Sequence, residues 1–281
     1  MAPRTSLRDP EPAVLPEIDS GTAAGRELEV RRDLLPGIEP ERRLDDWGRS
    51  QRLEGLLDRT VLEFLYRYWF RVAVEGIEHV PADGGALLVA NHAGALPPDG
   101  AMIAKAIREE HPRPRAVHTA VDDGFQSYPG LSMLLPKLGC VAAHPANVHR
   151  LLHDERALVL VFPEGREGAA KLYKDRYRLR RFGRGGFVEA ALRARAPIVP
   201  VAVLGAEEAA PSFFRAGPLG MIGYLPAKFT IRFLPPIPTD GPEERPWRDR
   251  ARVLAVADDV RATIHDHLVD MLRRRQSVWL G

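Results

Sequence analysis

Short apolar runs alternate with stretches of helical periodicity along most of the chain, and this rhythm limits the folds open to it. The apolar runs lie at residues 85–90, 115–121, 139–142, 157–162, 198–204 and 229–234. Residues 101–110, 128–138, 146–154 and 186–195 lie between them and have the spacing and capping residues of helices. Such alternation is typical of strands in a parallel sheet covered by helices. The sequence therefore predicts an α/β fold with a central, mostly parallel mixed sheet flanked by helices.

An amphipathic helix is predicted before this core, over residues 59–74. Its apolar side chains recur at helical spacing, whereas Arg59, Glu63, Arg67 and Arg71 repeat every four residues. Aromatic and arginine side chains suit a membrane interface, where apolar groups sink and cations meet lipid phosphates. A helix that simply covers the core is an equally good interpretation, so the pattern leaves both open.

The two ends of the chain differ in character. Residues 1–45 carry six prolines among many charges, a composition that buries too little apolar area to compensate for ordering. We expect a flexible tail over residues 1–45 and one folded domain over residues 46–281. A long helix over about residues 247–275 is predicted to close that domain.

Composition excludes several classes of protein. With 281 residues and 45% apolar content the chain can bury a substantial core, and a formal net charge of +2 argues against nucleic-acid binding. A single cysteine, Cys140, forms no intrachain disulfide and no thiolate metal site, which favours a reducing compartment and no bound metal. We find neither a secretory signal nor an apolar run of about 20 residues, so a cytoplasmic protein, soluble or peripherally attached to a membrane, is expected.

The loop after the apolar run at 85–90 carries a histidine and a carboxylate. His92 follows the predicted strand and Asp99 begins the next helix. A neutral imidazole takes a proton from a hydroxyl, and a carboxylate on its other nitrogen fixes the tautomer and stabilises the imidazolium. In open α/β sheets, ligands gather at the carboxyl ends of strands, which favours a base and its orienting acid over a turn histidine and a helix cap.

A second loop follows the predicted strand at 157–162. Its sequence Phe-Pro-Glu-Gly-Arg places Glu164 and Arg166 at the same edge of the sheet as His92. The two loops together resemble the Asn-His…Asp and Phe-Pro-Glu-Gly blocks of the lysophospholipid acyltransferase superfamily. The likeness continues through residues 182–187 and 197–203 and covers roughly residues 75–235. Four blocks in the order of the family make the resemblance specific.

The resemblance implies an activity and its residues. His92 would deprotonate an acceptor hydroxyl that attacks the thioester of acyl-CoA or acyl carrier protein, Asp99 would orient His92, and no cofactor would be needed. The acceptor would be a glycerolipid or lysophospholipid at the inner face of a membrane. The basic run from Lys171 to Arg184 would bind phosphates of the donor or of anionic lipid, or form a solvated surface. The residues expected to bind substrate are Asn91, Gly94, Pro163, Glu164, Gly165, Arg166, Lys171 and Arg184.

The sequence departs from the family at two places. Six residues separate His92 from Asp99, where four are usual, and we expect a widened turn that returns Asp99 to His92. Residues 139–145 lack the arginine that binds the acceptor phosphate in family members acting on phosphorylated glycerol. A neutral acceptor such as mono- or diacylglycerol is therefore one alternative, unless Arg166 or Arg184 binds the phosphate. A non-catalytic lipid-binding protein of the same fold is another.

Overall fold

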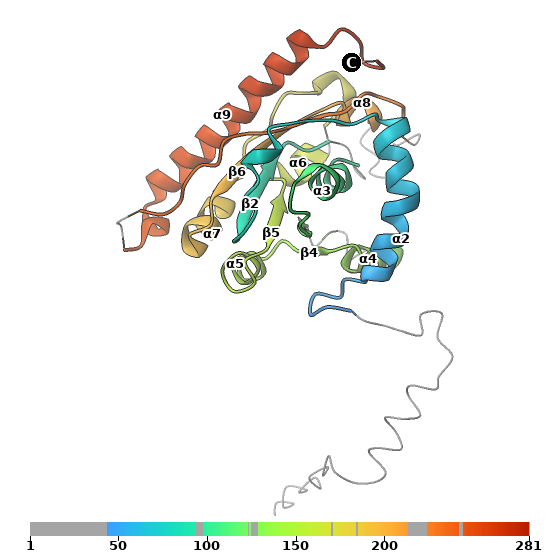
Figure 1. The fold of residues 1–281 in the computed structure, drawn as a ribbon. Coiled ribbons are helices and arrows are strands. Elements are labelled where there is room, and N and C mark those ends of the chain that lie inside the picture. The colour runs from blue at the N-terminus through green and yellow to red at the C-terminus, as the bar shows by residue number, and fades with distance from the viewer. Residues whose placement is uncertain are drawn as a thin grey trace, which may run out of the picture. The chain divides into compact units, whose positions relative to one another are not determined.

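A seven-stranded sheet forms the centre of the protein in the computed structural model (Figure 1). The structure describes residues 44–93, 98–122, 124, 129–169, 171–183, 185–212, 224–241 and 244–280. The strand order is β1-β7-β6-β2-β5-β3-β4, and every pair is parallel except β6 with β7. The strands are β1 (Ala73–Glu75), β2 (Ala86–Ala90), β3 (Val117–Val121), β4 (Cys140–Ala142), β5 (Leu158–Val161), β6 (Ile198–Leu204) and β7 (Thr230–Phe233). The predicted mostly parallel mixed sheet is confirmed.

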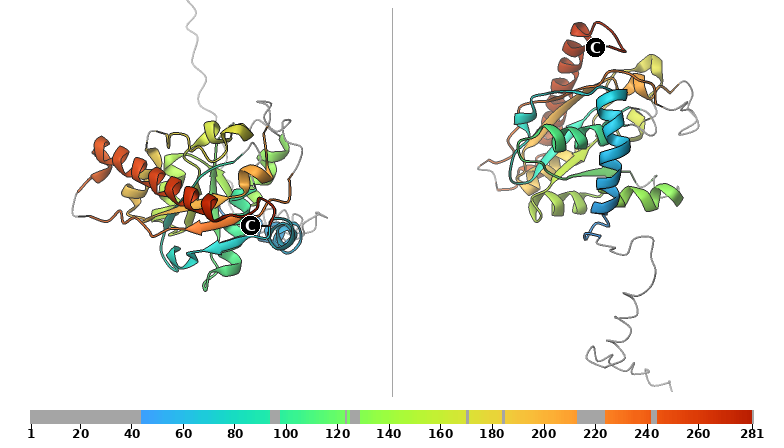
Figure 2. Two further views of the ribbon diagram at one scale, coloured as in Figure 1. Left: turned by 90° about the horizontal axis from the view of Figure 1, so that it is seen from above. Right: turned by 45° about the vertical axis from the view of Figure 1, so that its right-hand side comes forward.

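Helices cover both faces of the sheet (Figures 1 and 2). They are α2 (Gln51–Leu57), α3 (Asp99–Glu110), α4 (Pro129–Lys137), α5 (Pro145–His153), α6 (Gly165–Ala169), α7 (Gly186–Ala194), α8 (Ala206–Ala209) and α9 (Arg250–Arg274). Strand β2 shows why both faces need cover. All five of its residues are buried, with Leu87 and Val89 in one core cluster and Leu88 in the other. An unbroken apolar strand of this kind is characteristic of a sheet buried on both sides.

The N-terminal helix runs from Gln51 to Trp69, not over residues 59–74 as the sequence predicted. It begins as α2, where the Ser50 hydroxyl accepts from the amide of Leu53. It then continues through two π-helical segments, η1 (Asp58–Leu62) and η2 (Leu65–Trp69). Arg71 has a φ of 46°, a left-handed conformation that ends the helix, and the predicted last turn is instead strand β1, paired with β7. A three-residue edge strand gives too short a pattern to separate from an adjoining apolar helix.

The N-terminal helix carries two apolar sides. Leu62, Leu65 and Trp69 are partly buried and pack against the core, and Tyr66 is fully buried. Other apolar residues face outward, with exposed fractions of 53% for Leu56, 52% for Val61, 51% for Phe64 and 68% for Tyr68. The interpretation as a core-covering helix is therefore correct, and it leaves a second apolar side exposed.

A cluster of charges fixes the N-terminal helix on α3. The side chain of Lys105 is 1% exposed, and its ammonium lies 3.1 Å from the carboxylate of Asp58, 2.9 Å from that of Glu63 and 2.7 Å from that of Glu109. It also donates to the backbone oxygen of Asp58. A lysine is almost never fully buried unless it is paired in this way.

The C-terminal helix agrees closely with its prediction over about residues 247–275. Asp249 caps α9 by accepting from the amide of Arg252, and Arg274 is its last residue. The short helices α6 and α8 were not predicted. Except for residues 44 and 45, the tail predicted over residues 1–45 lies outside the described residues, so the flexible tail and the domain boundary after residue 45 stay predictions.

Candidate functional site

Three chain segments meet where the central strands leave the sheet. Strand β2 is flanked by β5 and β6, and all three are parallel, so their carboxyl ends lie at one edge. His92 follows β2, Glu164 follows β5, and Glu207 lies in α8 directly after β6. The topology thus gathers an imidazole and two carboxylates in the position where α/β sheets bind ligands.

His92 and Asp99 are in contact. The Nδ1 atom of His92 lies 3.2 Å from an oxygen of Asp99, which also accepts from the amide of Ala93. Asp99 is 1% exposed and is the first residue of α3, where the positive end of the helix dipole favours a negative charge. The ring of His92 lies against that of Phe162, with centroids 4.3 Å apart. With Nδ1 directed at Asp99, Nε2 is the nitrogen left for another partner, and the widened loop does return Asp99 to His92.

A buried carboxylate holds the backbone of His92. One oxygen of Glu164 accepts from the amide of His92 at 3.0 Å, and the other accepts from the amide of Arg180 at 2.7 Å. Lys171 lies 3.1 Å from Glu164 and 2.8 Å from Glu207, and the side chains of Glu164 and Lys171 are 0% and 2% exposed. Both residues were predicted to bind substrate, but these contacts engage their charged groups inside the protein.

The other predicted binding residues occupy different settings. Asn91 is buried, and its side chain donates to and accepts from the backbone of Val203, which ties the end of β2 to β6. Gly165 is exposed with a φ of 53° and begins α6, next to the half-buried Pro163. Arg166 is exposed and forms a 2.7 Å ion pair with Asp122, just beyond β3. Gly94 and Arg184 lie outside the described residues.

Sequence reasoning missed several residues that shape this site. Glu207 lies directly beyond a predicted strand, so the rule that pointed to His92 and Glu164 would also have found it. Gly168 packs so tightly that an added Cβ would lie 2.5 Å from the Cβ of Glu164 and 3.3 Å from that of His92. No sequence signal distinguishes this glycine, because the need for it arises only when the two loops meet.

Comparison with known proteins identifies the family. The model of the Acyltransferase family matches residues 71–204, the segment that contains His92, Asp99 and Glu164. An uncharacterized protein of Mycobacterium tuberculosis is 38% identical, in a match that covers 85% of this chain and 72% of that protein. An uncharacterized protein of Mycobacterium leprae is also 38% identical, with 70% of its length covered. The chain belongs to the lysophospholipid acyltransferase superfamily. The resemblance seen in the sequence is thereby confirmed.

A solved structure supports the fold of this acyltransferase. The 1-acyl-sn-glycerophosphate acyltransferase PlsC from Thermotoga maritima matches with a TM-score of 0.53 over 90% of each chain, at 18% identity. The match shows that the two proteins share a fold.

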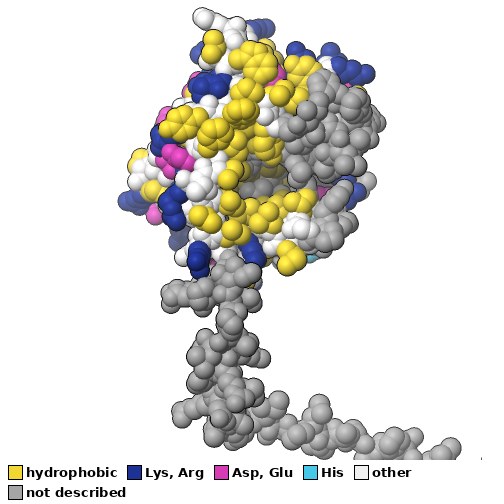
Figure 3. Space-filling model, turned by 90° about the vertical axis from the view of Figure 1, so that its right-hand side faces the viewer, with side chains coloured by type: hydrophobic (Ala, Val, Ile, Leu, Met, Phe, Trp, Pro, Cys, Tyr) yellow, Lys and Arg dark blue, Asp and Glu magenta, His cyan; other side chains and the backbone are white. Residues whose placement is uncertain are grey.

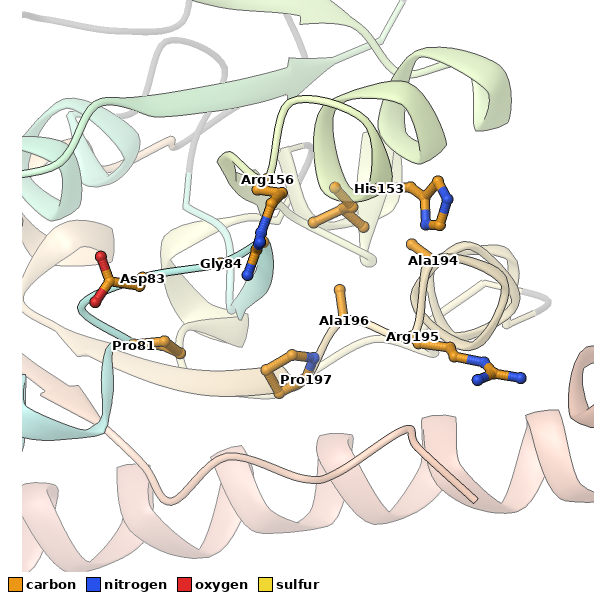
Figure 4. Close-up of a pocket in the computed structure, with 11 residues that line it drawn as sticks. Pro81, Asp83, Gly84, His153, Arg156, Ala194, Arg195, Ala196 and Pro197 are labelled. Atoms are coloured by element: carbon orange, nitrogen blue, oxygen red, sulfur yellow. The ribbon is translucent and has the colours of Figure 1, made fainter. Parts of the chain in front are cut away.

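A cavity of about 430 Å³ lies at the opposite edge of the sheet (Figure 4). Its walls come from residues that precede β2, β5 and β6, among them Gly84, Arg156 and Pro197. Helices α5 and α7 also end there, with His153 and Ala194 in the wall. The cavity is therefore separated from His92 by the length of the strands, and it contains none of the predicted site residues.

Burial makes Glu207 the site's most perturbed acid. Burial raises the pKa of Glu207 from 4.5 to about 7, the nearby charges of Glu164 and Asp99 act in the same direction, and Lys171 opposes them. The folded protein then binds a proton on Glu207 more tightly than the unfolded chain does. The contribution of Glu207 to stability is therefore greatest below pH 4.5 and declines as pH rises toward about 7.

We expect the stability of the Glu207→Gln variant, relative to that of the wild type, to increase as pH rises. The free energy of unfolding of both proteins is measured by chemical denaturation between pH 5 and pH 8, with Glu244→Gln, at an exposed glutamate, as control. The difference between Glu207→Gln and the wild type should shift toward the variant up to about pH 7 and then level off. Parallel curves for the two proteins would contradict the burial of an ionising Glu207.

Proposed function

We propose that this acyltransferase moves a fatty acyl group from acyl-CoA or acyl carrier protein to a hydroxyl of a glycerolipid or lysophospholipid. Nε2 of His92 takes the hydroxyl proton while the oxygen attacks the thioester carbonyl. The tetrahedral intermediate then collapses, the C–S bond breaks, and the imidazolium returns the proton to the leaving thiolate. No cofactor takes part, since the thioester itself supplies the activated acyl group.

The observation that carries this proposal is the 3.2 Å contact between His92 Nδ1 and Asp99. A carboxylate there favours the tautomer with a proton on Nδ1 and leaves Nε2 as an acceptor. It also stabilises the imidazolium formed when the hydroxyl loses its proton. The buried position of Asp99 strengthens this effect, because charges interact more strongly away from water.

The cations near the site bear on whether the acceptor is phosphorylated or neutral. Residues 139–145 contain no arginine or lysine, whereas Arg166 lies at the site edge and is 76% exposed. A phosphorylated acceptor therefore needs Arg184, or Arg166 after it has exchanged Asp122 for the lipid phosphate. A neutral acceptor such as mono- or diacylglycerol is the second candidate, and it has no need of that exchange.

The test is transfer of radiolabelled oleoyl-CoA to lysophosphatidate, lysophospholipids, monoacylglycerol and diacylglycerol, each presented in vesicles. A product that requires His92 supports the proposal and names the acceptor. Arg166→Met separates the two acceptor classes, because only a phosphorylated acceptor should lose affinity. Vesicle binding without transfer to any acceptor would instead support a non-catalytic, lipid-binding protein.

We propose that the outward side of the N-terminal helix holds the enzyme on the inner face of a membrane. Its exposed residues Leu56, Val61, Phe64 and Tyr68 continue onto α4, where Met133 is 71% exposed. The start of the helix adjoins α4 through the bond from the amide of Ser50 to the oxygen of Lys137. Figure 3 views the molecule from this side, where hydrophobic side chains gather around a hollow. An apolar area with cations nearby suits the boundary between lipid headgroups and acyl chains.

No described helix combines the length and apolar character that a membrane crossing requires. Attachment through a surface helix is consistent with that finding.

Phe64→Glu with Tyr68→Glu is expected to reduce flotation with anionic liposomes by at least about tenfold, because two charges must then leave water on binding. Both side chains face outward, so folding should persist. Leu65 and Trp69 on the same helix are unsuitable for this test because they pack against the core. Ala251→Glu with Ala255→Glu is the matched control on exposed positions of α9. Equal flotation of the two double variants would exclude this surface.

A further inference from the structure

Lys171 is an almost completely enclosed cation near His92. Its side chain is 2% exposed, and its ammonium lies between the carboxylates of Glu164 and Glu207, at 3.1 Å and 2.8 Å. These acids follow β5 and β6, the two strands that flank β2. Lys171 therefore links the two neighbours of the strand that carries His92.

Glu164 has Lys171 as its buried partner charge. It uses one oxygen for the amide of His92 and the other for the amide of Arg180. A protonated carboxyl has a hydroxyl in place of one acceptor oxygen, so it would hold these two N–H donors less well. An ionised carboxyl with 0% exposure needs a partner charge, and Lys171 supplies it.

Glu207 fixes Lys171 from the opposite side. One of its oxygens lies 2.8 Å from the ammonium, and the other accepts from the amide of Tyr177 at 2.7 Å. Lys171 thus has little freedom to turn toward the surface. These contacts are those of a residue that connects two loops inside the protein, and not those of a residue that binds a substrate phosphate.

We propose that Lys171 is a positioning residue for His92, which it serves by holding the Glu164 carboxylate against the backbone amide of His92. This inference rests on the proposed function, since it concerns the placement of the same base. Lys171 touches neither substrate nor reacting atoms in this role. Its effect reaches the imidazole through Glu164 and the chain at the end of β2.

The first test is amide hydrogen exchange, which needs no catalytic activity. Lys171→Met alone would leave two buried carboxylates facing each other, so the substitution is made in the Glu207→Gln background, where only one remains. Relative to Glu207→Gln, the double variant should exchange about tenfold faster in fragments covering the amides of His92 and Arg180. Lys137→Met on α4 serves as control. Unchanged exchange at these amides, or acceleration spread evenly over all fragments, would overturn the proposal.

The second test is kinetic. Lys171→Met in the Glu207→Gln background should lower kcat by about tenfold, while KM for donor and acceptor changes less than about threefold. Adding Glu164→Gln should then lower kcat little further, because Lys171 acts through Glu164. A rise in KM with kcat unchanged would show that Lys171 binds substrate after all. Absence of transfer by the wild type would contradict the proposed function, whereas the exchange experiment would still decide the role of Lys171.

Discussion

His92→Ala is expected to lower kcat for acyl transfer by about 10³-fold, the range in which a positioned general base contributes. The substitution removes the imidazole whose Nδ1 contacts Asp99. It keeps the bond from the amide of residue 92 to Glu164, which is made by the backbone. The fold and membrane binding should therefore be retained. Initial rates with a labelled thioester donor measure the effect.

Asp99→Asn gives the matched test of the pair. The amide keeps the shape of Asp99 but loses the charge that stabilises the imidazolium, so a loss of kcat of about 10²-fold or more is expected. His153→Ala, on the exposed end of α5, is the control histidine and should leave the rate unchanged. Activity within about threefold of wild type in His92→Ala would remove His92 from the chemistry and would mean that another group is the base.

Lys105→Met should have the largest effect on stability, lowering the free energy of unfolding by about 3 kcal/mol. Methionine fills most of the space of lysine, so the main loss is the cation shared by Asp58, Glu63 and Glu109. Removing it leaves three acids close together, one of them mostly buried. The pKa of Lys105 is raised by these carboxylates although burial opposes the charge, which indicates that the ammonium is stabilised in place. Urea denaturation monitored by tryptophan fluorescence measures the change.

Arg67→Met is the natural control for Lys105→Met. Arg67 pairs with Glu63 and Glu109, two of the same acids, but its side chain is 53% exposed. Exposed ion pairs contribute little because water screens them, so stability should hardly change. Equal destabilisation by the two substitutions would mean that the loss of either cation from these acids, and not the burial of Lys105, determines the change in the free energy of unfolding.

Most of the strands, and the site residues that follow them, could be predicted from the sequence. Runs such as residues 198–204 coincide with β6 because an apolar stretch bounded by turn residues has few alternatives in a parallel sheet. His92, Asp99 and Glu164 were found from their positions after strands. Strand β1 and helix α8 were missed because segments of three and four residues carry too little periodicity.

The contacts within the site were harder to predict than its members. Lys171 was predicted to bind substrate because it belongs to a basic run suited to phosphates, and only the fold reveals that its neighbours include two buried acids. The same holds for the N-terminal helix. Its periodicity located the apolar and charged positions. The sequence does not show which of the two apolar sides packs against the core.

Among the described strands, β1 pairs only with β7, the last of them in sequence, with Ala73 opposite Thr230. Phe70, just before β1, stacks on Phe229 at 4.4 Å, and Arg71 donates to the backbone oxygens of Pro226 and Trp279. During synthesis on the ribosome, the N-terminal helix can meet α3 early, but Phe70 and β1 at its end lack their partners until more than half of the chain has followed. Contacts between residues so distant in sequence form late, and they lower the rate of folding. Throughout that interval Phe70 and the apolar side chains near it lack part of their cover, which exposes apolar surface on the nascent chain.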